Sequence, residues 1–322
     1  MRKSLKRVLA LTLGATLAMS AFTGCSKEAK KYNVGICQLV QHEALDAATK
    51  GFKDALKEKL GDDVKFDEQN AQGDSATCST IVNTFVSSKK DLILANATAP
   101  LQAAANATEE IPILGTSITD YATALDLEDF DGTTGINVSG TSDLAPLDKQ
   151  ADLIKELFPD AKKVGILYCS AETNSKFQAD KITEHLNELG YECKEFTFVD
   201  SNDIAAVLNG AVDYSDVMYI PTDNTAASNT EVIDSIARPA GVPIVAGEAG
   251  ICKGCGVATL SISYYDIGYA SGLQAYEILK NGKDVSKMGI EYAPNVTKQY
   301  NKDICDELKI TVPEGYEAIE SN

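Results

Sequence analysis

Carboxylate, amide and hydroxyl side chains recur in short segments that directly follow apolar runs of this sequence. Two of these segments, PTDN (221–224) and GEAG (247–250), place an acidic residue just after an apolar run. Segments of the same kind are NATAP (96–100), GTSITD (115–120), SGTSD (139–143) and CSAETNS (169–175). Such groups can hold a small polar ligand, and a carboxylate adds a charge-assisted bond to a cationic group. Because turns favour the same residues, the interpretation depends on whether the segments meet in space.

The sequence shows no motif for nucleophilic or phosphate chemistry. It contains no G-x-G-x-x-G after a strand, no G-x-x-x-x-G-K-[ST] and no G-x-S-x-G. Only two histidines are present. We interpret His185, in KITEHLNEL, as a solvated helix residue, whereas His42 can either contact a ligand or help to begin a helix. We therefore predict no catalytic residue and no cofactor.

The cysteines do not form an obvious disulfide framework. Of the eight, Cys25 follows the N-terminal apolar run and is treated separately below. The remaining number is odd, so these cysteines cannot all pair with one another. Cys252 and Cys255 form a C-x-x-C that we place in a Gly-rich turn, away from the helix N-terminus that a redox motif needs. A zinc site needs two further ligands at suitable spacing, so we predict no metal. Structural cysteines, a labile disulfide and a metal site remain the alternatives, in that order.

Short apolar runs alternate with helical patterns along the chain, which indicates βαβ units and parallel sheets. Strands are predicted at 32–38, 64–70, 91–98, 111–116, 133–138, 162–169, 191–198, 216–223, 242–248 and 256–263. Helices are predicted at 44–60, 75–87, 101–107, 145–158, 174–189, 204–212, 225–239 and 264–279. Sheet sizes favour two five-stranded lobes over one ten-stranded sheet. The polar stretch 138–146 is the candidate crossing between them. Ligands of open parallel sheets bind beyond the carboxyl ends of strands, so the polar segments are expected to line a shared cleft.

The N-terminal residues predict export and lipid attachment. A basic start, a short apolar run and Thr23-Gly24-Cys25 match a secretory signal, 1–24, followed by a lipid-modified Cys25 and a tether, 25–31. A plain signal peptide and a membrane anchor are the alternatives, but the apolar run is shorter than the roughly 20 residues of a spanning helix. The formal net charge of −18 disfavours nucleic acid as a partner.

The polar segments, in their order along the chain, resemble a known family. The matching motifs are VGICQLVQHEALDAATKGF (34–52), ILANATAPLQAA (93–104), TSITD (116–120), GTSD (140–143), YCSAETNS (168–175), PTDN (221–224) and ATLSISYYDIG (258–268). With these motifs the chain resembles the solute-binding lipoproteins of ATP-binding-cassette importers, in the branch associated with uptake of aromatic amino acids.

That resemblance implies an α/β fold of two Rossmann-like lobes with parallel sheets, joined by a three-crossing hinge (a type I periplasmic binding protein). The N-terminal lobe is expected to hold 32–141 plus 262–290, and the C-terminal lobe 142–261 plus 291–322. The implied protein is no enzyme. It is a monomer held by lipid on the outer face of the cell membrane, which hands a small molecule to permease subunits driven by a cytoplasmic ATPase.

An amino-acid ligand sets the expected chemistry of the pocket. Its carboxylate needs hydroxyl and N–H donors near a helix start, for which we nominate Thr98, Thr116, Ser117 and Ser142. Its ammonium needs Asp223 or Glu248. The full set of predicted ligand-binding residues is Gln41, Thr98, Ala99, Thr116, Ser117, Ser142, Asp143, Tyr168, Ser170, Asn174, Ser175, Asp223, Asn224 and Glu248.

Simpler roles stand beside these assignments. Asp223 can be a helix N-cap, Glu248 a solvated loop residue, and Asn174 with Ser175 caps of the next helix. The tyrosines available to pack on the ligand, which can equally be core-edge residues, are Tyr121, Tyr168, Tyr264 and Tyr265. At the level of function, a branched-chain amino acid or a sugar, a cell-surface enzyme on the same scaffold, and an adhesion or scaffold protein are the alternatives. The lack of Trp counts against a sugar, whose ring is usually stacked on an aromatic residue.

Overall fold

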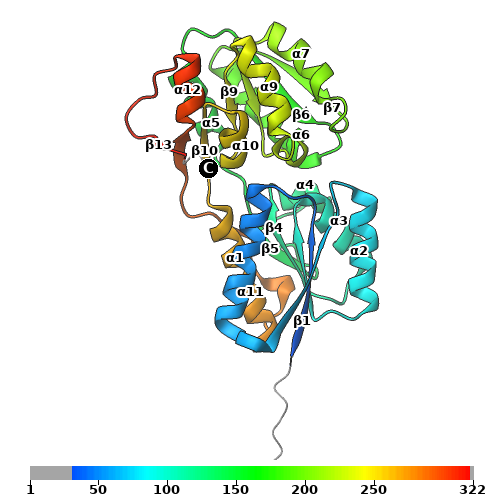
Figure 1. The fold of residues 1–322 in the computed structure, drawn as a ribbon. Coiled ribbons are helices and arrows are strands. Elements are labelled where there is room, and N and C mark those ends of the chain that lie inside the picture. Colours follow the sequence, from blue (N-terminus) through cyan, green and yellow to red (C-terminus); the bar gives the residue numbers. More distant parts are fainter. Residues whose placement is uncertain (1–30, 320–322) are drawn as a thin grey trace, which may run out of the picture. The chain divides into compact units, whose positions relative to one another are not determined.

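Two sheets, each flanked by helices, make up the part of the chain that the computed structural model describes, residues 31–319 (Figure 1). The predicted signal sequence (1–24), the lipid-bearing Cys25 and the tether up to residue 30 lie outside the described residues. From Tyr32 onward the chain forms one unit. No helix among the described residues is long and apolar enough to cross a membrane.

The first sheet has six parallel strands in the order β11-β5-β4-β3-β1-β2. The strands are β1 (Tyr32–Gln38), β2 (Val64–Asn70), β3 (Leu92–Asn96), β4 (Ile113–Ile118), β5 (Val138–Ser142) and β11 (Glu291–Tyr292). The associated helices are α1 (Glu43–Leu60), α2 (Ser75–Ser87), α3 (Thr98–Ala107), α4 (Tyr121–Leu125) and α11 (Tyr264–Asn281), with short 3-10 turns η1 (Gly61–Asp63) and η2 (Val285–Lys287).

The second sheet has seven strands in the order β13-β12-β10-β9-β8-β6-β7. They are β6 (Lys163–Cys169), β7 (Glu192–Phe198), β8 (Val217–Ile220), β9 (Ile244–Ala246), β10 (Ala258–Ser261), β12 (Thr297–Tyr300) and β13 (Glu317–Ala318). The helices are α5 (Leu147–Leu157), α6 (Thr173–Glu188), α7 (Ile204–Tyr214), α8 (Asn224–Ala227), α9 (Thr230–Ala240), α10 (Ala249–Cys255) and α12 (Lys302–Leu308). Strand pairing is parallel except between β10 and β12.

Strands buried on both faces explain the near-continuous apolar runs of the sequence. In β1, Ile36 and Cys37 point to opposite faces of the first sheet and enter separate hydrophobic clusters. The second sheet likewise has one cluster on each face, with Ile166 on one and Leu167 on the other. The predicted two-lobed α/β fold is therefore confirmed.

The chain passes between the two sheets three times, at 143–146, 262–263 and 293–296. The observed sheet membership differs slightly from the expected lobe limits, because Ser142 ends β5 and β11 pairs with β5 in the first sheet. Beyond these points, the lobe limits stay a proposal.

The predicted strand at 133–138 is wrong, and β5 occupies Val138–Ser142 in the stretch that we expected to be a crossing. Its polar residues are buried because their hydroxyls find partners. Ser139 donates to the Met288 carbonyl at 3.0 Å, and Thr141 lies 2.9 Å from the Ser271 hydroxyl. Gly140 is required at φ +139°, where a Cβ would lie 2.0 Å from the Gly115 carbonyl oxygen.

Close packing of α1 against α11 fixes the second crossing in place, and the two helices lie side by side in Figure 1. A Cβ on Gly268 would lie 2.0 Å from the Ala48 carbonyl oxygen, and one on Gly51 would lie 2.1 Å from the Tyr265 carbonyl oxygen. Only glycine permits this approach. As a result α11, which follows ten strands in the sequence, returns to the first lobe.

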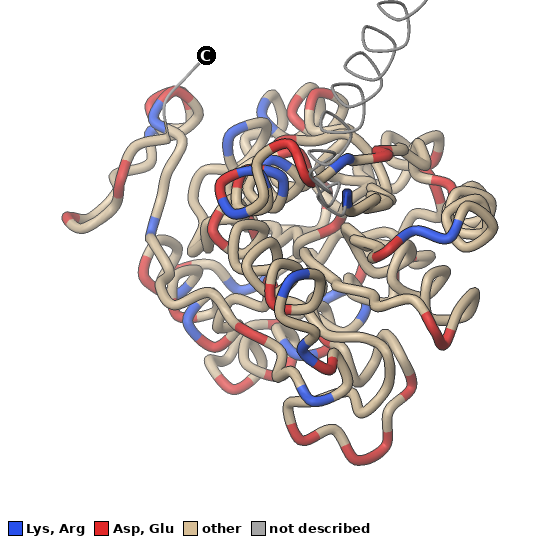
Figure 2. Tube along the Cα trace, turned by 90° about the horizontal axis from the view of Figure 1, so that it is seen from below, with Lys and Arg blue, Asp and Glu red and all other residues tan. Residues whose placement is uncertain are grey.

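Acidic residues are distributed along the described chain rather than gathered on one element (Figure 2). Most basic residues are paired, for example Lys53 with Glu68 at 2.5 Å and Arg238 with Asp234 at 2.7 Å. Such exposed pairs add little stability. The acidic surface is thus a solvated one and marks no binding face by itself.

Candidate functional site between the two lobes

The carboxyl ends of strands from both sheets meet around a small cavity. It is lined by His42, Leu45, Ser117, Asp143, Asn174, Thr222, Asp223, Asn224, Ala227, Glu248 and Tyr264. A cleft of about 320 Å³ shares Asn174 and Asn224 with it and also has walls from both lobes, including Thr98, Ala99, Glu172 and Thr225. The polar segments of the sequence therefore do converge in space.

Three carboxyl groups face the small cavity: Asp143, Asp223 and Glu248. All three are buried. None of the described residues that line the cavity or the adjacent cleft is Lys or Arg. Buried carboxylates are normally paired with a cation or strongly hydrogen-bonded, so the cavity has an unbalanced negative character.

Asp223 is the N-cap of α8, which confirms one of the two roles expected for it. Its Oδ1 accepts from the Ala226 N–H at 2.8 Å, and its Oδ2 accepts from the Cys169 N–H at 2.7 Å. Burial, followed by the nearby charge of Glu172, raises the pKa of the Asp223 carboxyl. The side chain thus ties the end of β6 to the start of α8 while it faces the cavity.

Glu248 is buried and is the N-cap of α10, so the alternative of a solvated loop residue is wrong. Its carboxylate accepts from the Gly250 N–H at 2.6 Å and from the Ile251 N–H at 2.5 Å. Burial raises the pKa of this carboxyl to about 7, against the lowering effect of the two amides. The sequence GEAG does not reveal α10, because its glycines disfavour a helix.

Asp143 lies on the first crossing, directly after β5. It accepts from the Thr119 hydroxyl at 3.1 Å and from the Tyr264 hydroxyl at 2.9 Å. Burial raises the pKa of the Asp143 carboxyl to about 6. Unlike the other two acids, Asp143 caps no helix, and its two side-chain partners are hydroxyls.

Two polar atoms that line the cavity are buried without a hydrogen-bond partner among the described residues: Ser117 Oγ and His42 Nδ1. Ser117 also has a φ of +57°, which is unusual for a residue other than glycine. Strained backbone and unpartnered polar atoms cluster at functional sites. His42 Nε2 lies 3.2 Å from Asn224 Oδ1 in the opposite lobe, and burial lowers the pKa of the imidazole. His42 therefore joins the cavity wall, and it also precedes α1.

The N-terminus of α3 opens onto the adjacent cleft without a side-chain cap. Its N-cap is Ala97, at φ +97°, and Thr98 and Ala99 supply the first N–H groups of the helix. Such N–H groups have no partner within the helix and favour an anion. Across the cleft, α6 also starts without a side-chain cap, because its N-cap Glu172 uses its carboxylate on Asn224 and Thr225. The expected capping by Asn174 and Ser175 is thus wrong.

The same cleft has an apolar part. Leu39, Val40, Ala99, Ala171 and Val199 line it. Val199 is 62% exposed, the most exposed of the large hydrophobic side chains in the described chain. A ligand with an apolar side chain would bury this surface, which is favourable by about 25 cal/mol per Å².

The structure does not bring every predicted residue to these two spaces. The six that line neither are Gln41, Thr116, Ser142, Tyr168, Ser170 and Ser175. Gln41 is exposed, and it lines an outer groove and the larger opening that contains His42 and Glu248. Thr116 accepts from Thr141 inside the first sheet, and Ser142 donates to the Thr119 carbonyl.

The remaining three lie behind the site in the second lobe. Tyr168 is in the hydrophobic core, and its hydroxyl donates to Glu195 at 2.5 Å. This Tyr packs away from the cleft because its position in β6 points to the other face. Ser170 is exposed and donates to the Phe198 carbonyl, and Ser175 is buried beside Asn174. The Tyr168 and Ser170 hydroxyls serve local structure, whereas the Ser175 hydroxyl hydrogen-bonds the Asp223 carboxyl.

Sequence reasoning missed three residues at the junction of the lobes: Thr119, Gln178 and Thr222. Tyr264, one of the tyrosines considered for packing on the ligand, lines the cavity. Gln178 donates from Nε2 to Thr119 Oγ1 at 3.1 Å and to Thr222 Oγ1 at 2.6 Å, which links the two lobes. The available signal was the helix period. Asn174 and Gln178 lie four residues apart on the buried face of α6, where apolar residues are otherwise expected.

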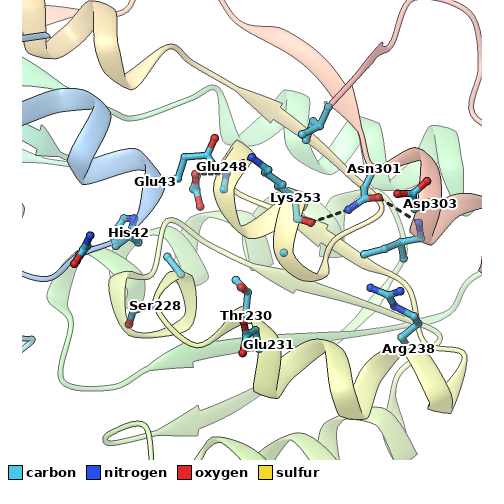
Figure 3. A pocket seen from close by; sticks show the side chains of 16 residues that line it. His42, Glu43, Ser228, Thr230, Glu231, Arg238, Glu248, Lys253, Asn301 and Asp303 are labelled. Atoms are coloured by element: carbon cyan, nitrogen blue, oxygen red, sulfur yellow. Dashed lines mark hydrogen bonds and ion pairs between the residues drawn. The ribbon is translucent and has the colours of Figure 1, made fainter. Parts of the chain in front are cut away.

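A second opening of about 530 Å³ shares His42 and Glu248 with the cavity (Figure 3). At its rim Lys253 in α10 pairs with Glu43 in α1 at 3.3 Å, a further contact between the lobes. Asn301 donates to the Lys253 carbonyl at 2.8 Å, as the dashed line shows. The small cavity thus shares lining residues with two larger polar spaces.

The C-x-x-C motif plays no part in the site. Cys252 and Cys255 lie inside α10, not in a turn, and both are buried and free. Burial raises the pKa of both thiols, which keeps them protonated and unreactive. Within residues 31–319, no group of three or more His, Cys, Asp or Glu side chains is placed to hold a metal ion.

Paired α/β lobes, three crossings and a polar cavity between strand ends define a two-lobed protein that binds a small molecule. Known proteins agree. Residues 33–319 match the family described as ABC transporter substrate binding protein. The chain belongs to this family.

Individual relatives point the same way. A tyrosine-binding protein of Clostridioides difficile (strain R20291) is 38% identical over 88% of this chain and 87% of its own length. A structure of an ABC domain from Streptococcus pneumoniae in complex with L-Trp has a TM-score of 0.86 and 31% identity, covering 90% of this chain and all of the other. A leucine-binding protein of Thermotoga maritima, at 15% identity, covers 86% of this chain and 87% of its own with a TM-score of 0.62, and shares the fold.

A second structure is the ligand-free, open form of a substrate-binding protein from Clostridium difficile. It is 37% identical to this chain and covers 90% of this chain and all of its own, but its TM-score of 0.69 is lower than the 0.86 of the L-Trp complex. The present structure is thus nearer in shape to the L-Trp complex than to that open form. The contacts of His42 with Asn224 and of Lys253 with Glu43 across the lobes agree with this ordering.

Proposed function

We propose that this substrate-binding protein captures a free aromatic amino acid, L-tyrosine or L-tryptophan, in the cavity between its lobes. It holds the ligand unchanged and delivers it to the permease of an ATP-binding-cassette importer. The chain acts as a monomer outside the cytoplasm, anchored by lipid on Cys25. The relatives named for tyrosine and crystallised with L-Trp support the ligand class.

The observation that carries the proposal is the separation of opposite polarities between the small cavity and the adjoining cleft. Three buried carboxyls, Asp143, Asp223 and Glu248, face the cavity, and none of the described residues that line it is Lys or Arg. A cationic ammonium group fits there. The uncapped N-terminus of α3, with Thr98 and Ala99, and the unpartnered Ser117 hydroxyl offer donors to a carboxylate.

The two ends of a zwitterion explain why ligand would hold the lobes together. Ser117 and α3 belong to the first lobe, whereas Asp223 and Glu248 belong to the second. Only an arrangement in which both lobes approach the ligand satisfies both charges, so the ligand favours that state by its differential affinity. The aliphatic wall of Leu39, Val40 and Val199 would cover the side chain.

Titration calorimetry with a matched ligand set tests the function. We expect L-tyrosine and L-tryptophan to bind, and hydroxyphenylpropionate, which lacks the ammonium, to fail. L-Leucine is the second candidate, because the apolar residues of the cleft are aliphatic. Binding of glucose without binding of any amino acid would overturn the proposal. Since the chain has no Trp, fluorescence of bound L-tryptophan gives an independent readout against a dark background.

The anchor and the oligomeric state need separate tests. Metabolic labelling with a fatty acid should mark the full-length protein, and Cys25→Ser should abolish the label. Light scattering should give the mass of one chain. An unlabelled protein, or a stable dimer, would correct those two parts and leave the ligand assignment standing.

A further inference from the structure

We propose that the cavity between the lobes binds protons when it is empty of ligand and releases about one of them when an ammonium group enters. The proton is thus a competing ligand for the carboxyl cluster of Asp143, Asp223 and Glu248. This inference rests on the proposed function, because it needs a ligand that carries an ammonium group.

The geometry creates a charge imbalance that some cation must relieve. Three carboxyls line one small, buried space, and an ionised carboxylate in such a space is costly without a positive partner. The lining residues supply none, since no Lys or Arg is among them. The imidazole of His42 does not fill the role, because burial lowers its pKa.

Acidic side chains on the neighbouring elements add further negative charge near the cluster. Glu172, which precedes α6, faces Asp223, and Glu43 at the start of α1 acts on Glu248. Lys253 in α10, which lines the second opening together with Glu248, pairs with Glu43 at the rim. The Tyr264 hydroxyl is neutral, and burial keeps its pKa well above the usual value. Every charged group that acts on the cluster from these elements is therefore negative or already paired.

Ligand chemistry cannot balance three negative charges with one positive charge. A zwitterion brings one ammonium and also a carboxylate, so below the pKa values of the cluster it can replace about one of the bound protons. In the empty protein more protons must be held. The raised pKa values, about 6 for Asp143 and about 7 for Glu248, put this exchange within the ordinary range of extracellular pH.

The balance of the exchange is simple. The ammonium replaces a proton as the positive partner of the cluster, one carboxyl O–H ionises, and the proton leaves to the solvent. No bond of the ligand is made or broken. By linkage, release of one proton makes the ligand affinity rise tenfold for each unit of pH below the pKa of the released group. Above that pKa the affinity no longer changes with pH. Acidity thus weakens capture.

Calorimetry of the full mature protein with L-tyrosine measures the proton directly. At about pH 6, the apparent enthalpy should differ between two buffers of unlike ionisation enthalpy, by the amount for about one released proton. At about pH 8.5 the difference should approach zero, because the carboxyls have ionised before the ligand arrives. Tyramine, which keeps the ammonium and lacks the carboxylate, should release the proton too.

Variants separate the cluster from the rest of the acidic chain. Asp143→Asn should lower the number of protons released, because Asp143 caps no helix and its loss removes one titrating group. Asp62→Asn is the matched control. It removes an equally negative but exposed side chain and should leave the proton number unchanged.

Infrared difference spectroscopy keeps the test decisive if a variant folds poorly. The wild-type protein at about pH 6 should lose a protonated-carboxyl band when L-tyrosine is added. Binding without proton release and without loss of that band overturns this inference and leaves the proposed function intact. No binding of L-tyrosine, L-tryptophan or tyramine overturns both.

Discussion

The Tyr264 hydroxyl donates a hydrogen bond of 2.9 Å to Asp143, and this bond joins two of the three crossings between the lobes. Asp143 lies on the first crossing, and Tyr264 begins α11 directly after the second. Both line the cavity. A ligand that contacts Asp143 therefore acts on the segments about which the lobes move. Hinges between domains usually consist of a few residues in loops or at the ends of helices and strands, as here.

Tyr264→Phe should weaken binding of L-tyrosine about tenfold or more. The change removes a hydrogen bond to a charged group, which contributes about 1.5–3 kcal/mol, and it makes the ionised form of Asp143 harder to reach. Titration calorimetry near neutral pH measures the loss. Tyr265→Phe is the control, because its hydroxyl lies 3.2 Å from Asp54 on α1, outside the cavity. Equal losses in both variants would refute a special role for Tyr264.

Asp223→Asn should lower the stability of the unliganded protein by about 1–3 kcal/mol, the cost of leaving a buried donor unsatisfied. Both carboxylate oxygens accept buried N–H groups, and an amide has only one acceptor oxygen. Denaturant unfolding measures the change. Asp74→Asn should cost much less, because Asp74 uses one oxygen to cap α2 through the Thr77 N–H, and Asn caps almost as well. A stable Asp223→Asn protein would contradict this structural role.

Ser117→Gly should stabilise the fold and weaken the ligand complex. Glycine relieves the left-handed φ of +57°, which is worth on the order of 1 kcal/mol, but the variant loses the hydroxyl aimed into the cavity. Lys89→Gly is the control, since Lys89 has a similar φ of +51° and lies away from the cleft. It should gain stability with unchanged affinity. Undiminished binding by Ser117→Gly would remove this residue from the site.

Stability of the unliganded protein should fall as pH rises from about 5 to about 8. The folded-state pKa values of Asp143 and Glu248 are raised, to about 6 and about 7. A carboxyl whose pKa is raised by folding binds a proton more tightly in the folded state. Its contribution to the free energy of unfolding is therefore complete below its unfolded-state pKa and is lost as the pH rises through its folded-state pKa. Thermal unfolding across this range measures the slope, and saturating L-tyrosine should flatten it.

Repulsion among the many surface acids also grows with pH, so a control must isolate the cluster. Asp143→Asn should reduce the slope, whereas Asp62→Asn should not, although both remove one acidic group. A slope that is the same in wild type, Asp143→Asn and Asp62→Asn would show that the buried carboxyls do not titrate in this range.

The fold was predicted well from the sequence where runs of apolar residues mark buried strands and the alternation of strands and helices indicates parallel pairing. Strands such as Tyr32–Gln38 and Lys163–Cys169 are buried on both faces, so their composition alone reveals them. The prediction failed where polar residues are buried through long-range partners. The strand Val138–Ser142 reads as a polar loop, because nothing local shows that Ser139 and Thr141 find acceptors on residues far along the chain.

The candidate site was predictable to the level of segments and less so to the level of side chains. Strand ends identified the loops of Ser117, Asp143, Asp223 and Glu248, which line one cavity. Which individual residues line the cavity depends on the direction in which each side chain points. Tyr168 precedes Cys169 at the end of β6 yet points into the core, since neighbouring residues of a strand face opposite sides. The inter-lobe role of Gln178 depends on Thr119, which no local pattern connects to it.

The most direct measurement is a crystal structure of the protein with L-tyrosine. We expect one ligand that spans the cavity and the adjoining cleft, with its ammonium within hydrogen-bond distance of at least one of Asp143, Asp223 and Glu248, and its carboxylate at Ser117 and the first N–H groups of α3. A ligand bound outside the space between the lobes, or one whose carboxylate faces the three acids, would contradict this expectation.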